Sequence, residues 1–364
     1  MRKKIHLVVL FGGRSGEHEV SLMSARSVLA ALKRERYEVI PVGIAKDGRW
    51  LASPNALEAF AAGRLEGLTP VTLLPDPSRR GLWQWEGESL KPYAPVDAVF
   101  PVLHGTFGED GTLQGLLEMA DVAYVGAGVV GSAVGMDKGI FKDVMRAHGL
   151  PLAEYVLLSR REVEADAEAA ADRCEAVAPY PLFVKPANLG SSVGITKAHH
   201  RAELLAGLHL AARYDRRIVV ERGLDAREIE VAVLGNAEPR ASLPGEIVPG
   251  EEFYSYEAKY EDDTSQLLIP APLSAEQTAR VRDLAVAVYR AIDCAGMARV
   301  DFLLERESGV FYINEVNTLP GFTHISMYPK LWEATGLPYS DLLDELVALA
   351  QERKRERDSI RRER

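Results

Sequence analysis

The feature that most constrains the fold is a series of apolar runs near the N-terminus in which polar residues do not alternate. The runs IHLVVLF (5–11), YEVIPVGI (37–44) and VDAVFPVL (96–103) are typical of strands that are buried on both faces. Apolar residues at helical spacing follow the first run from 17 to 34, and GTLQGLLEMA (111–120) predicts a shorter helix. Such strands, separated by helices, predict an α/β domain with a parallel sheet covered on both faces.

Polar residues follow two of these strands at the points where the strands end. A glycine-containing loop (12–19) with Glu17 and Glu19 follows the first strand, and His104 follows AVFPVL. Ligands bind at the carboxyl ends of strands in such sheets, so we expect Glu17 and His104 to lie in one crevice. Two other interpretations stay open. Acidic residues stabilise the first turn of a helix, and a lone loop histidine is more often a hydrogen-bonding residue than a catalyst.

Length and composition limit the class of protein. A chain of 364 residues is too long for one ordinary core, which predicts two or three domains. The net charge of −10 argues against a general nucleic-acid binder. We expect neither a membrane helix nor a signal peptide. The only cysteines, Cys174 and Cys294, fit a reducing cytoplasm, and the mixed-charge end (351–364) predicts a solvated helix end or a frayed terminus.

The segment VAYVGAGVVGSA resembles a dinucleotide-binding loop. Gly126, Gly128 and Gly131 have the G-x-G-x-x-G spacing after a strand. Such a loop needs an acidic residue at the end of the next strand to bind the ribose, and Glu154 lies near the beginning of that strand instead. A hinge between domains explains the glycines better.

The segment PLFVKPANLGSSVGITK (181–197) predicts a phosphate-binding loop between two strands. Small residues allow backbone N–H groups and hydroxyls to approach an anion closely, and Lys185 adds a positive charge. The small residues are Gly190, Ser191, Ser192 and Gly194. The G-x-x-x-x-G-K-[ST] pattern is missing from this segment, and a plain glycine-containing hairpin remains an alternative.

Two β-runs near the C-terminus (297–306 and 310–317) predict a hairpin with a three-residue turn, 307–309, that ends in glycine. In the resulting register Asp301 lies opposite Glu315, and Leu303 and Ile313 continue the same face of the sheet.

The same register places Arg299 opposite Asn317 on the face of Asp301 and Glu315. Opposed carboxylates are destabilising unless a positive group lies between them. Two carboxylates and an amide suit Mg²⁺, which also binds substrate phosphates. A network of salt bridges among Arg299, Asp301 and Glu315 is the alternative, but a metal beside a phosphate loop indicates a nucleotide site.

Several motifs, in order along the chain, resemble the ATP-grasp fold: GMDK, VKP, GSSVGI, VVERGL and ARVDF…INEVNTLPG. Four others closely resemble D-alanine–D-alanine ligases: FGGRSGEHEVSL, LHGTFGEDGTLQG, YEAKY and PGFTHISMYP. The resemblance reaches about residue 350. It implies an N-terminal parallel α/β domain (1–125), a central ATP-grasp subdomain (126–220), an α+β C-terminal ATP-grasp subdomain (221–350) and a charged tail (351–364).

The resemblance also implies which residues bind ATP and metal. Asp301, Glu315 and Asn317 would ligate two Mg²⁺ ions, with Glu315 bridging, and Mn²⁺ can take their place. The residues expected at ATP are Lys138, Lys185, Ser191, Ser192, Glu221, Leu224, Glu228 and Lys259. Of these, Lys138 and Lys185 would contact phosphates, Glu221 and Leu224 the adenine, and Glu228 the ribose.

For the amino-acid substrates, the resemblance implies that Glu17 receives the ammonium group of the first D-alanine, with His104 beside it. Tyr260, in a lid over 250–265, would bond Ser191, which bonds Glu17.

Arg299 and the backbone N–H of Gly321 would stabilise the tetrahedral oxyanion. Ser326 and Lys259 would hold the carboxylate of the second substrate.

The implied activity is ATP-dependent ligation of two D-alanines through a D-alanyl phosphate, for peptidoglycan precursors, by a cytoplasmic homodimer. A relative that joins D-alanine to D-lactate or D-serine is the nearest alternative, and the retained Tyr260 favours the dipeptide. A dehydrogenase that uses GAGVVG would leave the Asp301, Glu315 and Asn317 face unexplained. A non-catalytic ATP-binding protein would not need the complete set of charged groups.

Overall fold

The computed structural model describes residues 3–190, 193–248 and 266–361. The first apolar run forms β1 (Ile5–Gly12), which pairs in parallel with β2 (Tyr37–Ile44) and with β7 (Ala98–Val102). Residues 7–11 of β1 are completely buried, as expected of a strand covered on both faces. The parallel N-terminal α/β sheet predicted from the sequence is therefore confirmed.

The sequence analysis did not predict that this sheet continues as an antiparallel meander. The sheet has eight strands in the order β6-β5-β4-β3-β2-β1-β7-β8, and pairing is antiparallel from β2 to β6. The added strands are β3 (Trp50–Ala52), β4 (Thr69–Leu73), β5 (Leu82–Glu86), β6 (Ser89–Ala94) and the parallel β8 (Ala123–Tyr124). The helices of this domain are α1 (His18–Ala31), α2 (Ala56–Ala61) and α3 (Thr112–Met119).

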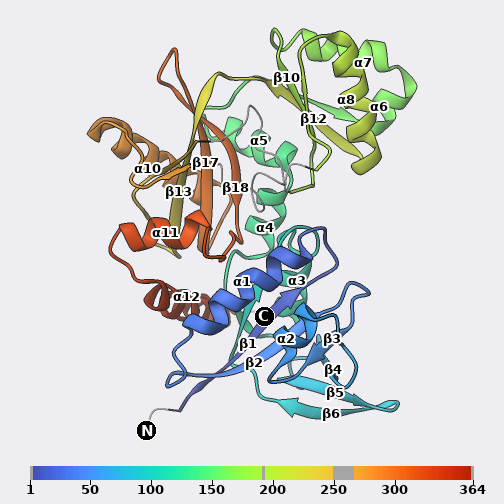
Figure 1. Cartoon of the computed structure of the whole chain (residues 1–364), viewed down its shortest axis with the longest axis vertical. Coiled ribbons are helices and arrows are strands. Elements are labelled where there is room, and N and C mark those ends of the chain that lie inside the picture. The colour runs from blue at the N-terminus through green and yellow to red at the C-terminus, as the bar shows by residue number, and fades with distance from the viewer. Residues whose placement is uncertain (1–2, 191–192, 249–265, 362–364) are drawn as a thin grey trace.

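A second body contains a four-stranded antiparallel sheet in the order β11-β10-β12-β9. It lies at the upper right of Figure 1, away from the N-terminal sheet at the bottom. Its strands are β9 (Tyr155–Ser159), β10 (Leu182–Pro186), β11 (Thr196–Ala198) and β12 (Arg217–Arg222), and its helices are α6 (Arg160–Ala165), α7 (Ala167–Glu175) and α8 (Arg201–Tyr214). Apolar side chains from these elements form a core of their own.

A third sheet has the order β16-β15-β13-β17-β18, with β14 paired to β13. Its strands are β13 (Ala226–Gly235), β14 (Arg240–Ala241), β15 (Gly245–Val248), β16 (Gln266–Leu268), β17 (Gly296–Glu305) and β18 (Phe311–Asn317). The remaining helices are α4 (Val129–Met136), α5 (Lys138–Ala147), α10 (Ala275–Ala291), α11 (Met327–Ala334) and α12 (Tyr339–Ser359).

The hydrophobic cores connect these sheets unequally. One core joins the N-terminal sheet to α11, α12 and part of the third sheet. Another packs α5 and α10 against β13, β17 and β18. The β9–β12 body thus shares fewer apolar contacts with the other two sheets than those sheets share with each other. The predicted domain boundaries at residues 125, 220 and 350 stay a prediction.

Two glycines of GAGVVG, Gly126 and Gly131, lie in close packing, whereas a Cβ atom on Gly128 would have no atom within 4 Å. Gly128 precedes α4, and a Cβ atom on Gly131 would lie 3.2 Å from the carbonyl oxygen of Asp293. A Cβ atom on Gly296 would likewise lie 3.2 Å from the backbone nitrogen of Gly126. Small residues are needed here because two backbone segments touch.

The charged C-terminal segment, for which a solvated helix end or a frayed terminus was expected, continues α12 as far as Ser359. Arg353 donates to the carbonyl oxygens of Gly126 and, at 3.2 Å, of Tyr124, and its guanidinium lies 4.2 Å from the centroid of the Tyr124 ring. Arg357 pairs with Glu118. The end of α12 therefore contacts the N-terminal domain.

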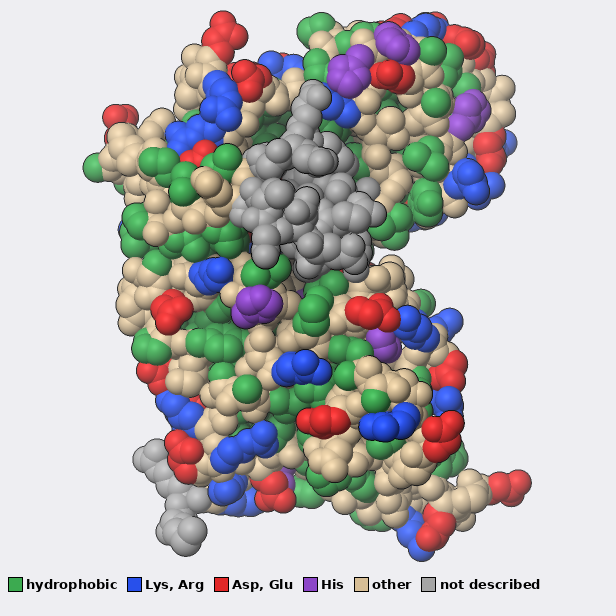
Figure 2. Space-filling view, in the orientation of Figure 1, with side chains coloured by type: hydrophobic (Ala, Val, Ile, Leu, Met, Phe, Trp, Pro, Cys, Tyr) green, Lys and Arg blue, Asp and Glu red, His purple; other side chains and the backbone are tan. Residues whose placement is uncertain are grey.

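Figure 2 shows acidic and basic side chains interspersed over the visible face of the N-terminal domain. The expectation against a general nucleic-acid binder stays a prediction. No helix among residues 3–190, 193–248 and 266–361 is long and apolar enough to cross a membrane.

Asp344 of α12 joins the C-terminal helix to the N-terminal domain. It accepts bonds from Lys33 (2.8 Å), Arg36 (2.6 Å) and the hydroxyl of Tyr37 (2.6 Å). Burial alone would raise the pKa of Asp344, but the bonds from Lys33 and Tyr37 and the charge of Arg36 lower it below its usual 3.8. The carboxylate is thus stabilised in its charged form by contacts made only in the folded protein.

We predict that Asp344→Asn lowers the free energy of unfolding by about 2 kcal/mol, because three donors lose a charged acceptor. Asp341→Asn is the matched control. Its side chain is 49% exposed, against 10% for Asp344, and it pairs with Lys33 alone, so we expect a change below about 1 kcal/mol.

Urea unfolding at neutral pH measures both effects. Since the pKa of Asp344 is lowered on folding, its contribution is present above pH 3.8 and is lost as the pH falls below that value. Equal losses in the two variants at neutral pH would contradict the assignment.

Candidate active site

The hairpin of β17 and β18 forms the base of the site, and its register at the predicted ligands is confirmed. Asp301 pairs with Glu315, and Arg299 pairs with Asn317. The predicted three-residue turn is wrong, because the N–H of Glu305 bonds the carbonyl of Val310, which leaves four residues in the turn.

A bulge beside Asp301 restores the register, so that Phe302 pairs with Ile313 and Leu303 with Tyr312. Ile313 was therefore placed on the wrong face. It is buried in the core beneath the sheet, and Tyr312 takes its place beside Leu303. Asn314 is the extra residue, since it stands between two consecutive pairs of the ladder.

Three neighbouring strands place carboxylates side by side at this point. Glu230 of β13 pairs with Asp301 on β17, which pairs with Glu315 on β18. Arg299 donates to both oxygens of Asp301 (2.7 and 2.6 Å), and its Nε lies 3.0 Å from Glu230. Burial would lower the pKa of Arg299, but Asp301, Glu230 and Glu315 raise it well above its usual value.

This arrangement contains features of both interpretations left open by the sequence. The Arg299–Asp301 salt bridge exists, and Asn317 donates to Asp301 at 2.9 Å. The donors are carboxylate and amide oxygens, which fit Mg²⁺ and not zinc. The described part of the chain contains no group of three or more His, Cys, Asp or Glu residues arranged to hold a metal. The metal assignment to Asp301, Glu315 and Asn317 stays a prediction.

A second cluster of charges connects the β9–β12 body to α5. Glu221, at the end of β12, is buried between Lys185 of β10 and Lys142 of α5, whose Nζ lies 2.7 Å from Glu221. Lys185 also lies 3.4 Å from the side-chain oxygen of Asn314. Burial would raise the pKa of Glu221, but the two lysines outweigh it and lower that pKa to about 2.

Of the other residues expected at ATP, the structure describes Lys138, Leu224 and Glu228. Lys138 begins α5 and donates to the carbonyl of Leu189 at 2.6 Å, immediately before the predicted phosphate loop. Asp137 caps the same helix by accepting from the N–H groups of Gly139 and Ile140. Leu224 lies between β12 and β13, and Glu228 lies on β13 opposite Leu303.

Glu17 immediately precedes α1 at the edge of the parallel sheet, and it lies against glycines of two bodies. A Cβ atom on Gly105 would lie 2.5 Å from Oε2 of Glu17, and one on Gly190 would lie 3.1 Å from the same atom. Gly105 belongs to the N-terminal domain and Gly190 to the predicted phosphate loop. Glu19, by contrast, pairs with Lys46 at 2.6 Å on the surface.

His104 is buried, and both ring nitrogens have partners. Nδ1 lies 3.2 Å from the carbonyl of Leu319, and Nε2 lies 3.1 Å from the hydroxyl of Ser24. A carbonyl only accepts, so Nδ1 carries the proton and Nε2 accepts from Ser24. Burial lowers the pKa of His104 more than the charge of Glu17 raises it. His104 is therefore a neutral ring that joins the N-terminal domain to the loop after β18.

Gly321 and Ser326, which the sequence assigned to the second half of the reaction, lie together. A Cβ atom on Gly321 would lie 2.7 Å from Oγ of Ser326. The same Oγ accepts from the N–H of Thr323 at 3.0 Å. The segment is thus a compact turn before α11.

Four predicted site residues lie outside the residues that the structure describes: Ser191, Ser192, Lys259 and Tyr260.

Sequence reasoning missed three charged residues of the site. Glu230 lies two residues after Glu228 and so on the same face of β13. Its place beside Asp301 depends on the pairing of β13 with β17, which the sequence does not reveal. Lys142 follows Lys138 by one helical turn. Glu109 accepts from the N–H of Gly105 at 2.7 Å, and burial together with Glu17 raises the pKa of Glu109 to about 8. Glu109 lies in the motif LHGTFGEDGTLQG, which indicated the family but no separate role for this carboxyl.

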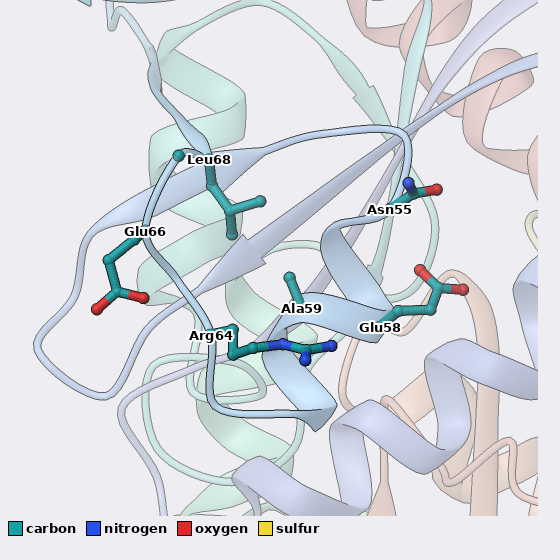
Figure 3. Close-up of a pocket in the computed structure, with 7 residues that line it drawn as sticks. Asn55, Glu58, Ala59, Arg64, Glu66 and Leu68 are labelled. Atoms are coloured by element: carbon teal, nitrogen blue, oxygen red, sulfur yellow. The ribbon is translucent and has the colours of Figure 1, made fainter.

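A pocket of about 690 Å³ lies elsewhere, beside α2 and the loop that follows it. Figure 3 shows Asn55, Glu58 and Ala59 on the helix side and Arg64, Glu66 and Leu68 on the loop side. It opens to solvent and contains no residue of the clusters described above.

Comparison with known proteins identifies relatives over almost the whole chain. The family model described as the D-ala D-ala ligase N-terminus matches residues 6–127, and the model for the C-terminus matches residues 144–348. A D-alanine–D-alanine ligase of Heliobacterium modesticaldum is 53% identical, covering 96% of both chains. One of Natranaerobius thermophilus is 49% identical, covering 98% of this chain and 97% of the relative.

Two solved structures are also similar. The D-alanine–D-alanine ligase of Coxiella burnetii has a TM-score of 0.82 at 37% identity and covers 98% of this chain and 96% of its own. A D-Ala:D-Ser ligase of Enterococcus faecalis has a TM-score of 0.85 at 36% identity and covers 96% of this chain and 100% of its own.

Proposed function

The chain belongs to the D-alanine–D-alanine ligase family, with the ATP-grasp fold, and we propose on that premise that it joins two D-alanines at the expense of ATP. The products are D-alanyl-D-alanine for peptidoglycan precursors, ADP and phosphate. The observation that carries the proposal is the match of both family models to this chain. In addition, Lys185, which pairs with Glu221, lies beside the strand that carries Glu315.

In the first step, a carboxylate oxygen of one D-alanine attacks the γ-phosphorus of ATP, and the bond from that phosphorus to ADP breaks. Lys138 and Lys185 neutralise charge on the phosphates, as phosphoryl transfer requires. Glu221 and Leu224 meet the adenine, and Glu228 meets the ribose.

Asp301, Glu315 and Asn317 are proposed to hold Mg²⁺, or Mn²⁺ in its place. Bound there, the metal neutralises charge on the transferred phosphoryl group. The support is the oxygen-only donor set on one face of the β17–β18 hairpin. Asn314, beside Glu315, lies 3.4 Å from Lys185, which connects this face to the proposed phosphate site.

Glu17 is proposed to bind the ammonium group of the first D-alanine, with His104 beside it. In the second step the amine of the other D-alanine attacks the acyl carbon and loses a proton, and phosphate leaves with the electrons of the C–O bond. Arg299 and the N–H of Gly321 stabilise the oxyanion. In the structure, Arg299 contacts Asp301 and Glu230 through Nε and Nη2.

Ser326 and Lys259 are proposed to hold the second carboxylate. Tyr260, Ser191 and Glu17 are proposed to connect the lid, the phosphate loop and the N-terminal domain, and Ser192 to assist at the phosphates. The proximity of Gly190 to Glu17 supports this connection, since it brings the phosphate loop to the first substrate. We further infer a cytoplasmic homodimer, and the two buried, free thiols of Cys174 and Cys294 are in keeping with a reducing compartment.

Phosphate release from ATP and Mg²⁺ with D-alanine, and identification of the product by mass, tests the function. We expect D-alanyl-D-alanine from D-alanine, no product from L-alanine, and at least a 1000-fold loss of kcat in Glu315→Gln, on the order of 4 kcal/mol of lost transition-state stabilisation.

The matched control for that variant is Glu19→Gln, which removes a carboxylate that pairs with Lys46 on the surface. D-serine and D-lactate are added as second substrates because one similar structure is a D-Ala:D-Ser ligase. A dominant mixed product would contradict the dipeptide assignment, and absence of ATP turnover would contradict the ligase.

Gly105→Ala tests the position of Glu17. The added Cβ atom would lie 2.5 Å from Oε2 of Glu17, so the carboxylate must move. We predict a loss of kcat/KM for D-alanine of about 30-fold, equivalent to about 2 kcal/mol.

Gly63→Ala is the matched control, because Gly63 has a similar φ (+65° against +72°) and no atom within 4 Å of an added Cβ. Steady-state kinetics with thermal unfolding separate the local effect from backbone strain. Indistinguishable kinetics of the two variants would show that Glu17 does not bind substrate in this position.

A further inference from the structure

Lys142 is a buried charged residue for which the proposed reaction has no role. It lies on α5 with 2% of its side chain exposed, and Nζ is 2.7 Å from Oε2 of Glu221. The ring of Tyr155 lies over it, with 5.5 Å between Nζ and the ring centroid. Lysine is almost never fully buried unless it is paired, so the Glu221 contact holds this side chain in place.

The two oxygens of Glu221 are bound by different lysines. Oε2 binds Lys142, and Oε1 binds Lys185. The lysines differ in their surroundings. Lys142 is enclosed, whereas Lys185 is 13% exposed and lies 3.4 Å from the side-chain oxygen of Asn314, beside the row of proposed metal ligands.

Lys142 is therefore held in one position, whereas Lys185 can change its partner. Lys185 also lies beside Asn314, and in the proposed function it contacts the phosphates of the nucleotide. Lys142 has no such choice, because α5, Tyr155 and Glu221 surround it. When Lys185 turns to phosphate, Oε1 of Glu221 becomes available, while Oε2 stays bound to Lys142.

We propose that Lys142 is a positioning residue that holds Glu221 so that Oε1 accepts a hydrogen bond from the exocyclic amino group of adenine. The inference rests on the proposed function, since it takes Glu221 as the adenine contact. Guanine carries a carbonyl oxygen at the corresponding ring position, which a carboxylate repels. Lys142 therefore contributes to the preference for ATP over GTP without touching the nucleotide.

A merely structural lysine predicts a different result. Loss of such a residue would lower stability and weaken all nucleotides alike. Loss of a positioning residue changes the ratio between adenine and guanine nucleotides, because a loosely held carboxylate discriminates less well. The ratio is thus the measurement that distinguishes the two roles.

The test uses Lys142→Met and Lys142→Gln as neutral variants, Lys142→Arg as the charge-conserving variant, and Lys46→Met as a control that breaks a surface pair with Glu19. Calorimetry gives the Kd of ADP and GDP, and kinetics give kcat and KM for ATP, GTP and D-alanine. The thermal midpoint of each variant is measured alongside.

In the neutral variants we expect the KM for ATP and the Kd of ADP to rise at least tenfold. The ratio of kcat/KM between ATP and GTP should fall by a similar factor, with the KM for D-alanine changed less than twofold. Lys142→Arg should keep most of the ratio, and Lys46→Met should keep all of it.

An unchanged ADP:GDP ratio in a folded neutral variant overturns the inference, even if its stability falls. Should one neutral variant not fold, the other supplies the result. A wild-type protein that binds ADP but forms no dipeptide would contradict the proposed function alone, because the Kd ratio still tests Lys142.

Discussion

The attraction between Arg299 and the carboxylates around it is the interaction on which the site depends. Three paired strands place Glu230, Asp301 and Glu315 next to one another on a largely buried face. Like charges in such positions repel and are poorly screened. Arg299 binds Asp301 with two donors and also contacts Glu230, so the sheet can form before any nucleotide binds. Asp301 and Glu315 are also the carboxylates that we propose as ligands of Mg²⁺.

The arrangement of the cores explains how separate bodies contribute to one site. The N-terminal sheet and the last two helices share a core, whereas the β9–β12 body has its own. Glu221 links that body to α5 through Lys142, and Gly190 brings its loop to Glu17. Few apolar contacts need to be broken for such a body to move. Charged and backbone contacts therefore set its position over the site.

How much the sequence could predict depends on the distance along the chain between interacting residues. The buried N-terminal strands were predictable, because continuous apolar runs indicate strands that are covered on both faces. The Asp301–Glu315 pair was predicted correctly although the predicted turn was one residue too short. The predicted turn was wrong, because the loop is one residue longer than predicted. The extra residue at Asn314 shifts the strand pairing back, so that Asp301 still lies opposite Glu315. Neither the longer loop nor the bulge leaves a signal in the sequence. Because the bulge was not predicted, Ile313 was assigned to the wrong face of the sheet.

The antiparallel meander, Glu230 and Lys142 depend on pairings between segments far apart in the sequence, which periodicity does not reveal. Glu109 was missed for a similar reason: its pKa depends on burial and on Glu17, which is distant in the chain. The resemblance to a family supplied roles for residues whose local patterns were ambiguous, such as Glu17 and His104.

Transfer of oxygen from D-alanine to phosphate tests the central claim most directly. With D-alanine labelled by ¹⁸O in both carboxylate oxygens, one labelled oxygen forms the bond to the γ-phosphorus and leaves with phosphate. The account predicts one ¹⁸O atom in the inorganic phosphate for each dipeptide formed, measured by mass spectrometry, with one ¹⁸O retained in the new amide. Dipeptide formation with unlabelled phosphate would contradict the acyl-phosphate mechanism.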